Sequence, residues 1–383
     1  MNTDVTAKDI GLQQNIEALK QLSQIRIAVI SDAAPERNGV GTYYIDLIGH
    51  LKNRVAEIDI FCPTIENGQW KAGLVFPLPG DATQKLCFPN PIKMKRFIQN
   101  IKPDVVLIAT PGVYGIVGAY LAHQLKIPAI TGFHTSFKQL TDLYWKDSIA
   151  GKIVHGYFKV SHYYLFKKCQ TVLANSEDMI EQARKLNPRN VKLISTVISP
   201  LFTNADTQPY DGKFKRILFA GRLAPEKNID TIIKAAKALP QLHFSIAGDG
   251  PLMDTFQQSV KGLSNVSMLG WLNREALRDQ IDQHDALILP SHFESFGTIV
   301  LEAMARKRLV IVSKGCGIAD WPEYARGFYT MESDELLPTL NRITEQSNDE
   351  RQAMASTAKQ ITQAINEKSL HAWYDVLLEH CRK

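Results

Sequence analysis

The chain has 383 residues, of which 45% are hydrophobic and 22% are charged, and this ordinary globular composition excludes a disordered or fibrous chain. A single hydrophobic core rarely grows beyond about 250–300 residues, so the length predicts two domains. The net charge of +5 is too small to indicate nucleic acid as a partner, and no nucleic-acid-binding motif is present. The five cysteines form no CxxC pair, which predicts free thiols in a reducing cytoplasm.

Short β-branched segments alternate with longer amphipathic segments through the first half. The predicted strands begin at Ile25, Ile58, Asp104, Pro128, Thr171 and Val191. Residues 105–125 lack charge and are long enough to span a bilayer, but Pro111-Gly112 divides them, so we interpret them as strand, turn and helix. Near-continuous apolar strands separated by helices predict a parallel sheet with both faces covered. Residues 1–24 lack an apolar segment, so we expect no signal peptide and a cytoplasmic protein.

The alternation pauses at residues 196–215, which contain two prolines and little apolar periodicity and are therefore predicted to be a linker. It then restarts with five further predicted strands, RILFA, HFSIAG, NVSMLG, ALILP and RLVIVS. Residues 333–383 contain no clear strand and are predicted to be helical. The fold class is therefore α/β, with two doubly wound domains joined by one linker.

A glycine-containing turn follows the first predicted strand. Gly39 and Gly41 have GxG spacing, but Tyr44 occupies the third position of a dinucleotide fingerprint, which excludes that motif. No Walker A sequence and no DxD pair is present. Backbone N–H groups at the start of the following helix still favour an anion. From these residues alone, a plain tight turn is an equally good interpretation.

Two cations lie on the loop after the RILFA strand, where open α/β sheets bind ligands. Arg222 offers a planar fork and Lys227 a point charge, which suit a diphosphate. A solvated loop in which Glu226 pairs with one of them is slightly favoured if only this motif is considered.

Two glutamates flank the start of a predicted helix in SHFESFGTIVLEAMARKRLVIV. Glu302 lies inside an apolar stretch, where a carboxylate needs hydrogen-bond donors. A sugar diol and a neighbouring loop are both suitable donors, and the segment alone does not separate them. Glu294 precedes the helix, and the backbone N–H groups that open it are available to an oxygen atom: Phe296, Gly297 and Thr298. His134, which ends a first-half strand, would by itself be interpreted as a core residue.

Together these segments resemble the retaining GT-B glycosyltransferases of the large family four, which transfer a hexose from a nucleotide sugar. The resemblance spans roughly residues 25 to 375, and the joint order and spacing of its motifs are highly specific. The motifs are Asn38-Gly39-Val40-Gly41, Asn175–Glu177, Gly221-Arg222 with Glu226-Lys227, Gly248–Pro251, and Glu294 spaced from Glu302 by seven residues. Two departures are Thr196-Val197-Ile198-Ser199, where the family often has Asn-Gly-Val-Asp, and a single glycine before Val40.

The resemblance implies a role for each matched residue. Arg222 and Lys227 would bind the donor diphosphate and stabilise the leaving group, and Glu302 would hold the ribose. Glu294 and His134 would contact the transferred sugar. The Gly39 and Gly41 loop would close over the β-phosphate, Phe296, Gly297 and Thr298 would offer amides, and Gly250, Pro251, Trp271, Leu272 and Pro290 would surround the nucleotide.

The resemblance also implies a GT-B fold, in which two doubly wound Rossmann-like domains face each other across a cleft, together with domain boundaries and a mechanism. An acceptor-binding domain would cover residues 1–199, a nucleotide-sugar-binding domain residues 200–366, and a helix at 367–383 would cross back to the first domain. Transfer would retain the anomeric configuration by front-face attack, with the leaving diphosphate taking the acceptor proton. The lack of DxD fits a reaction without a metal or other cofactor. A UDP-linked donor and a GDP-linked donor are both compatible.

The acceptor is expected to be a lipid-linked molecule or a glycan. Residues 1–200 carry 23 basic and 16 acidic side chains, a net charge of +7, and FHTSF resembles lipid-directed mannosyl and glycolipid transferases. A basic amphipathic helix is predicted at residues 91–102, and its cations would face an anionic inner membrane surface: Lys93, Lys95, Arg96 and Lys102. A helix that simply covers the sheet is the alternative. The alternative functions are a nucleotide-sugar epimerase and a sugar-binding protein without catalysis.

Overall fold

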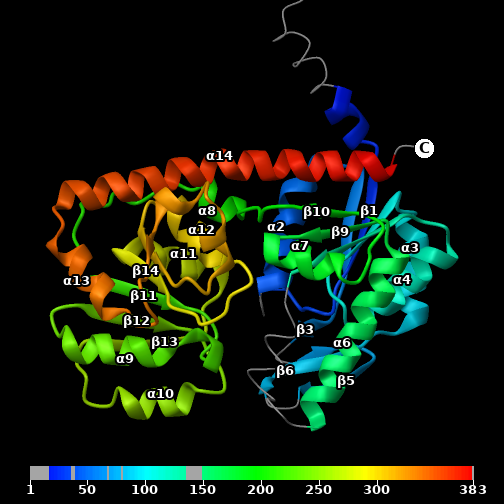
Figure 1. Cartoon of the computed structure of the whole chain (residues 1–383). Coiled ribbons are helices and arrows are strands. Elements are labelled where there is room, and N and C mark those ends of the chain that lie inside the picture. The colour runs from blue at the N-terminus through cyan, green and yellow to red at the C-terminus, as the bar shows by residue number, and fades with distance from the viewer. Residues whose placement is uncertain (1–16, 36–38, 67–68, 79–80, 135–148, 382–383) are drawn as a thin grey trace, which may run out of the picture.

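The structure is a computed structural model that describes residues 17–35, 39–66, 69–78, 81–134 and 149–381. Within these residues, two six-stranded parallel sheets lie side by side (Figure 1). The first has the order β10-β9-β8-β7-β1-β2 and the second the order β13-β12-β11-β14-β15-β16. The predicted fold class, two doubly wound α/β units, is therefore confirmed.

The strands of the first sheet all lie where the sequence predicted them. They are β1 (Arg26–Ile30), β2 (Glu57–Phe61), β7 (Val105–Ile108), β8 (Ala129–Phe133), β9 (Thr171–Ala174) and β10 (Val191–Leu193). Two antiparallel hairpins were not predicted: β3 (Thr64–Glu66) with β4 (Gln69–Lys71), and β5 (Leu74–Leu78) with β6 (Asp81–Phe88). Because residues 105–125 form β7, a turn and α4 (Val113–Gln124), the strand–turn–helix interpretation of this uncharged stretch is correct. In the described part of the chain, no helix is long and apolar enough to cross a membrane.

Both faces of the first sheet are buried because its strands are apolar at successive positions. Ile27 and Val29 of β1 point into the core formed with α2 (Gly39–Leu51), while Ala28 and Ile30 point into the opposite core. The opposite core is covered by α3 (Pro91–Ile101), α4, α6 (Ile149–Lys168) and α7 (Glu177–Arg184).

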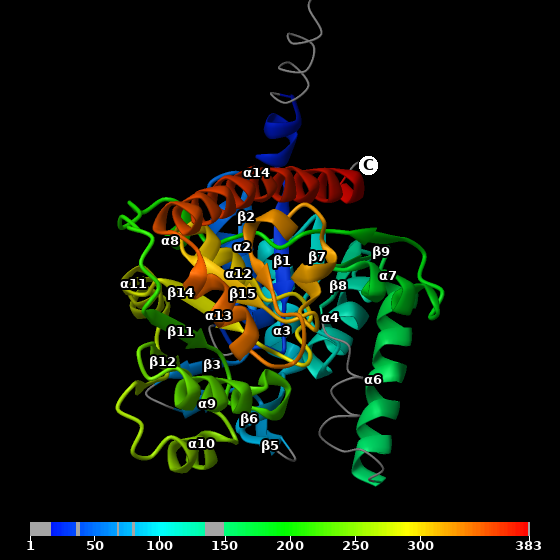
Figure 2. The ribbon, with the colours of Figure 1, turned by 60° about the vertical axis from the view of Figure 1, so that its left-hand side comes forward.

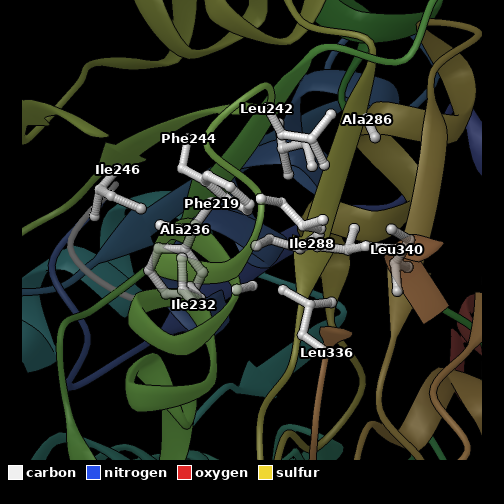
Figure 3. Packing of buried hydrophobic residues seen from close by; sticks show 14 of the residues in the cluster. Phe219, Ile232, Ala236, Leu242, Phe244, Ile246, Ala286, Ile288, Leu336 and Leu340 are labelled. Atoms are coloured by element: carbon white, nitrogen blue, oxygen red, sulfur yellow. The ribbon is translucent and has the colours of Figure 1, made fainter. Parts of the chain in front are cut away.

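The second sheet repeats this layered arrangement. Its strands are β11 (Arg216–Ala220), β12 (His243–Ala247), β13 (Val266–Gly270), β14 (Ala286–Leu289), β15 (Leu309–Val312) and β16 (Tyr329–Thr330). One face packs against α9 (Ile229–Ala238), α10 (Met253–Ser259) and α13 (Leu337–Glu345), and Figure 3 shows Phe219 and Ile288 of the sheet meeting Ile232 of α9. The other face packs against α8 (Pro200–Thr203), α11 (Arg274–Gln283) and α12 (Thr298–Ala305).

Two segments of the chain connect the halves, and they are bonded to each other. The predicted linker contains α8 and buries Phe202 completely, so it is part of the core rather than a solvated connection. The 34-residue helix α14 (Asn348–Cys381) runs along both halves (Figure 1), with Ala355 in a core of the second sheet and Trp373 in a core of the first. The backbone N–H of Ile198 donates to Oδ1 of Asn366, 2.8 Å away. The predicted boundary between residues 366 and 367 falls inside α14, and the domain boundaries themselves stay a prediction.

Candidate active site

The predicted cations lie on the loop that follows β11, at the carboxyl edge of the second sheet. Nη2 of Arg222 lies 2.9 Å from Oε1 of Glu226, so the pairing considered as the alternative to diphosphate binding does form. Nζ of Lys227 donates to Oε2 of Glu294, 67 residues further along the chain. Burial alone would disfavour the ammonium, but the adjacent Glu294 carboxylate raises the pKa of Lys227, so this side chain stays charged.

A second loop braces the cation loop through two glycines. Gly248 has φ of +137°, and a Cβ there would lie 1.8 Å from the carbonyl oxygen of Gly221. A Cβ on Gly250 would lie 2.4 Å from the carbonyl oxygen of Leu223. Since real side chains do not fit these gaps, the two loops need glycine in order to pack together. The structure therefore gives Gly250 a packing role, and its contact with the donor stays a prediction.

The segment that leads into α12 contains three of the residues predicted to contact the sugar: Glu294, Phe296 and Gly297. Gly297 caps this helix with φ of +96°, a left-handed conformation that favours glycine. The backbone of Glu294 is fixed by its N–H donating to Gly315 and its carbonyl accepting from Gly317, at 3.0 and 2.8 Å. Phe296 is buried in the core, so its backbone amide, rather than its ring, remains the candidate sugar contact.

Glu302, the predicted ribose ligand, belongs to a buried ion network that joins the two halves. Arg274 donates from Nη1 to Oε1 of Glu302 at 2.5 Å and from Nη2 to Oδ2 of Asp46 at 2.9 Å. The exposed fractions of the Arg274, Asp46 and Glu302 side chains are 13%, 5% and 2%. Burial raises the pKa of Asp46 to about 7 and also raises that of Glu302, while Arg274 opposes both shifts. The alternative for Glu302, a structural hydrogen bond, is therefore present, but its donor Arg274 is the first residue of α11 rather than part of a loop.

His134 follows β8 at the carboxyl edge of the first sheet. Its Nε2 lies 3.0 Å from the hydroxyl of Tyr44, and a Cβ on Gly132 would lie 2.2 Å from the same nitrogen, so glycine is needed there. Burial lowers the pKa of His134 to about 4, so the ring is neutral near pH 7 and offers a hydrogen bond rather than a charge. The pairing of Phe133 with Ala174 makes Asn175 the neighbour of His134 across the strands.

The two halves meet near His134. Indole Nε1 of Trp321 donates to the backbone carbonyl of Asn175 at 2.9 Å, and the hydroxyls of Ser195 and Tyr324 lie 3.0 Å apart. Oδ1 of Asn175 is buried, and no described residue gives it a hydrogen-bond partner. The side-chain oxygen of Asn175 is therefore a candidate for contact with a ligand at this interface.

The predicted phosphate loop is the first turn of α2 rather than a turn before it, because α2 begins at Gly39. A Cβ on Gly41 would lie 2.5 Å from the carbonyl oxygen of Ala34, whereas Gly39 has open space around its Cα. Gly41 therefore needs to be glycine for packing, and Gly39 does not. Asn38 of the same motif lies outside the described residues.

The predicted base-pocket residues gather at the carboxyl edge of the second sheet. Trp271 and Leu272 connect β13 to α11, Pro251 follows the β12 loop, and Pro290 follows β14. Trp271 is half-exposed and Pro251 exposed, while Pro290 is buried. Among the residues that the structure describes, no three His, Cys, Asp or Glu side chains form a group that could hold a metal ion. The expected independence of metal stays a prediction.

The sequence matches known families over both halves. Residues 37–200 match Glycosyltransferase Family 4, and residues 203–361 match Glycosyl transferases group 1. The chain belongs to the glycosyltransferases. A GDP-mannose-dependent alpha-mannosyltransferase of Mycolicibacterium smegmatis is 26% identical over 317 residues, which cover 77% of this chain and 81% of that protein. Sulfoquinovosyl transferase SQD2 of Arabidopsis thaliana is 24% identical over 234 residues, 58% of this chain and 45% of that protein.

Solved structures share the fold of this glycosyltransferase. Anabaena HepE in complex with UDP and glucose has a TM-score of 0.67 at 18% identity, covering 91% of this chain and 99% of that chain. WaaG, a glycosyltransferase involved in lipopolysaccharide biosynthesis, has a TM-score of 0.64 at 13% identity, covering 92% and 99%. The two sheets therefore form a GT-B fold.

The chain spans about half the length of the first curated relatives that it matches.

Four residues predicted for the donor site lie in two clusters of this glycosyltransferase, and the roles of all the predicted site residues stay predictions. Lys227, Glu294 and Gly297 form one cluster at the start of α12. Glu302 belongs to the other, whose members Arg274 and Asp46 were not predicted. A buried carboxylate in an apolar helix required a donor, and the donor was identifiable only once the fold placed Arg274 beside it.

Proposed function

We propose that this protein transfers a hexose from a nucleotide diphosphate sugar to a hydroxyl of a lipid-linked or glycan acceptor, with retention and without a metal ion. The observation that carries the proposal is the contact between Lys227 and Glu294. It joins the predicted diphosphate ligand to the predicted sugar ligand at the start of α12, so one small volume offers a cation, a carboxylate and free helix N–H groups.

The chemistry follows from these groups. The bond between the anomeric carbon and the diphosphate oxygen breaks, the acceptor oxygen bonds to the same face of that carbon, and its proton passes to the leaving diphosphate. Negative charge develops on the diphosphate, and Arg222 and Lys227 are held in place by Glu226 and Glu294 to offset it. The neutral imidazole of His134 would accept or donate one hydrogen bond to a sugar hydroxyl.

Relatives support a nucleotide sugar without fixing its base. One is named as GDP-mannose-dependent, whereas a structural neighbour was solved with UDP-glucose. Trp271, half-exposed at the carboxyl edge, offers a ring for stacking on either base. The donor is therefore proposed as UDP- or GDP-linked.

A lipid-linked acceptor is supported by the surface of the first half. On α3, Ile98 and Ile101 cover the sheet as the alternative interpretation held, while four cations remain exposed: Lys93, Lys95, Arg96 and Lys102. Helix α6, which packs against α4 and stands at the side of the molecule in Figure 2, exposes Ile153 and Val160 by 68% and 69%. The lysines next to them in the chain, Lys152 and Lys159, are exposed as well. An exposed apolar stripe beside cations suits the surface of an anionic membrane.

The catalytic proposal is tested with Lys227→Met and Lys227→Arg. Loss of one preorganised charge contact costs about 10²–10³-fold in turnover, so Lys227→Met should lower transfer by that factor and Lys227→Arg by less. Lys234→Met is the matched control, because Lys234 lies on α9 in an exposed pair with Glu335. Donors are first found by thermal shift with UDP, GDP, ADP and their sugars. Near-normal turnover of Lys227→Met would refute the diphosphate assignment.

Product analysis tests the remaining parts of the proposal. NMR of the product should show the anomeric configuration of the donor, and EDTA should leave the rate unchanged. Donor conversion to an epimer without acceptor would instead support the epimerase, and sugar binding without nucleotide would support a binding protein. For the membrane, Ile153→Ser with Val160→Ser should reduce flotation with anionic vesicles, and equal absence of wild-type binding to anionic and neutral vesicles would remove the claim.

A further inference from the structure

One arginine connects the helix that carries the predicted phosphate loop to the helix that carries the predicted ribose ligand. Arg274 is the first residue of α11, directly after the predicted base-pocket residues Trp271 and Leu272. Its guanidinium contacts Asp46 of α2 and Glu302 of α12. Arg274 therefore connects three segments that are predicted to face the donor: the base-pocket residues before α11, helix α2 and helix α12.

Further contacts hold Arg274 and its partner Asp46 in place. The guanidinium carbon lies 4.7 Å from the centre of the Phe202 ring, on α8 of the connection between the halves. The Ser199 side chain donates a hydrogen bond to Asp46. Helix α2 packs against α8, which in turn packs against α11 and α12 (Figure 1). The network is thus a rigid junction beside the connection, not an exposed pair between flexible side chains.

Only arginine fits this junction. Its planar fork reaches two carboxylates through two separate nitrogens, whereas a lysine ammonium is one point charge. Without that charge, two buried carboxylates would face each other with little screening. The position of α2 relative to α12 therefore depends on Arg274.

We propose that Arg274 is a positioning residue, which, together with Asp46, fixes the first turn of α2 over the β-phosphate of a donor whose ribose is held by Glu302. The inference rests on the proposed function and assigns to these residues the coupling of the two halves of the donor site. Asp46 contacts Arg274 and Ser199 and is not predicted to touch the donor, so substituting it changes the coupling without removing a donor ligand.

The coupling predicts a specific pattern of nucleotide affinities. A nucleoside monophosphate lacks the β-phosphate, so its binding is expected to depend only on the second half of the protein. A nucleoside diphosphate is also expected to contact the first turn of α2, so its binding depends on both halves. The affinity advantage of UDP over UMP, or of GDP over GMP, should therefore fall roughly tenfold in Asp46→Asn. Asp46→Glu, which keeps the charge, should recover part of it, and Arg274→Lys should resemble Asp46→Asn. Glu302→Gln should instead weaken diphosphate and monophosphate alike.

Isothermal titration with all four nucleotides tests this inference. Asp285→Asn is the matched control, because Asp285 is a buried carboxylate that accepts from Arg216 at the amino end of β11, away from the ligand edge. It should lower the melting temperature without changing the affinity ratio. An unchanged ratio in Asp46→Asn overturns the inference and leaves the proposed function standing, whereas failure of every nucleotide to bind the wild type overturns both.

Discussion

The acid sensitivity of the first half provides a quantitative test of the packing behind His134. His162 of α6 lies against Phe133, which precedes His134, with ring centres 4.9 Å apart, and against Phe166 at 5.6 Å. Its Nδ1 lies 2.7 Å from the carbonyl oxygen of Phe158. Burial lowers the pKa of His162 from 6.5 to about 4, although this hydrogen bond opposes the shift.

The sign of the effect follows from proton uptake. Between pH 6.5 and pH 4, His162 is protonated in the unfolded chain but stays neutral in the native protein. The free energy of unfolding therefore falls as the pH falls toward 4. The full difference in pKa is worth about 3 kcal/mol. Of this, about 2 kcal/mol is lost between pH 7.5 and pH 5.

His162→Asn removes the titration and keeps an amide near the position of Nδ1. The variant should be less stable than the wild type at pH 7.5, because ring packing is lost, and the gap should shrink by about 2 kcal/mol at pH 5. Asp32 and Asp46 have pKa values raised by burial to about 6 and about 7, and they act in the opposite direction. Both carboxyl groups are present in the variant and in the wild type, so their contributions cancel in the difference between the two free energies of unfolding. This difference is therefore the quantity to measure.

Urea unfolding should be followed by hydrogen exchange in peptides from β8 and α6, because a chain with two cores need not unfold in one step. His123→Asn is the control, since His123 is an exposed residue of α4 and its replacement should leave the pH dependence unchanged. A stability gap between His162→Asn and wild type that stays constant from pH 7.5 to pH 5 would refute the reasoning.

Three substitutions test other features of the site and fold. Gly132→Ala should push the His134 ring aside and cost about 1–3 kcal/mol of stability together with transfer activity, and normal activity would show that the ring position is unimportant. Gly297→Ala should cost about 1–2 kcal/mol through its positive φ, measured by urea unfolding, whereas an unchanged midpoint would contradict the left-handed cap. Trp373→Phe removes a 2.9 Å hydrogen bond to Tyr43 and should cost about 1 kcal/mol, and no loss would mean that water replaces the bond.

The sequence predicted the strands well because they are short, apolar and β-branched on both faces, as buried parallel strands must be. It missed β16, which has only two residues, and the hairpins at residues 64–88, whose strands include polar segments such as TIE and QWK. Sheet order was not predicted, since it depends on which strands meet in three dimensions.

The candidate site was predictable only where short motifs carry it. Lys227 and Glu294 were both selected from the sequence, but their contact was not, because 67 residues separate them. Arg274 gave no signal, since NREAL reads as an ordinary polar helix start, and its partner Asp46 lies 228 residues earlier. The apolar surroundings of Glu302 indicated that a partner must exist without indicating which one.

The hydrogen bond between Ile198 and Asn366 constrains how this molecule can open. Each residue belongs to one of the two chain segments that connect the sheets, so the two connections are tied to each other and cannot bend independently. Any change in the angle between the sheets must therefore move both connections together. The hydrogen bond from Trp321 to Asn175 also joins the halves but involves neither residue of this tie, so its loss would free that part of the interface and leave the two connections bonded.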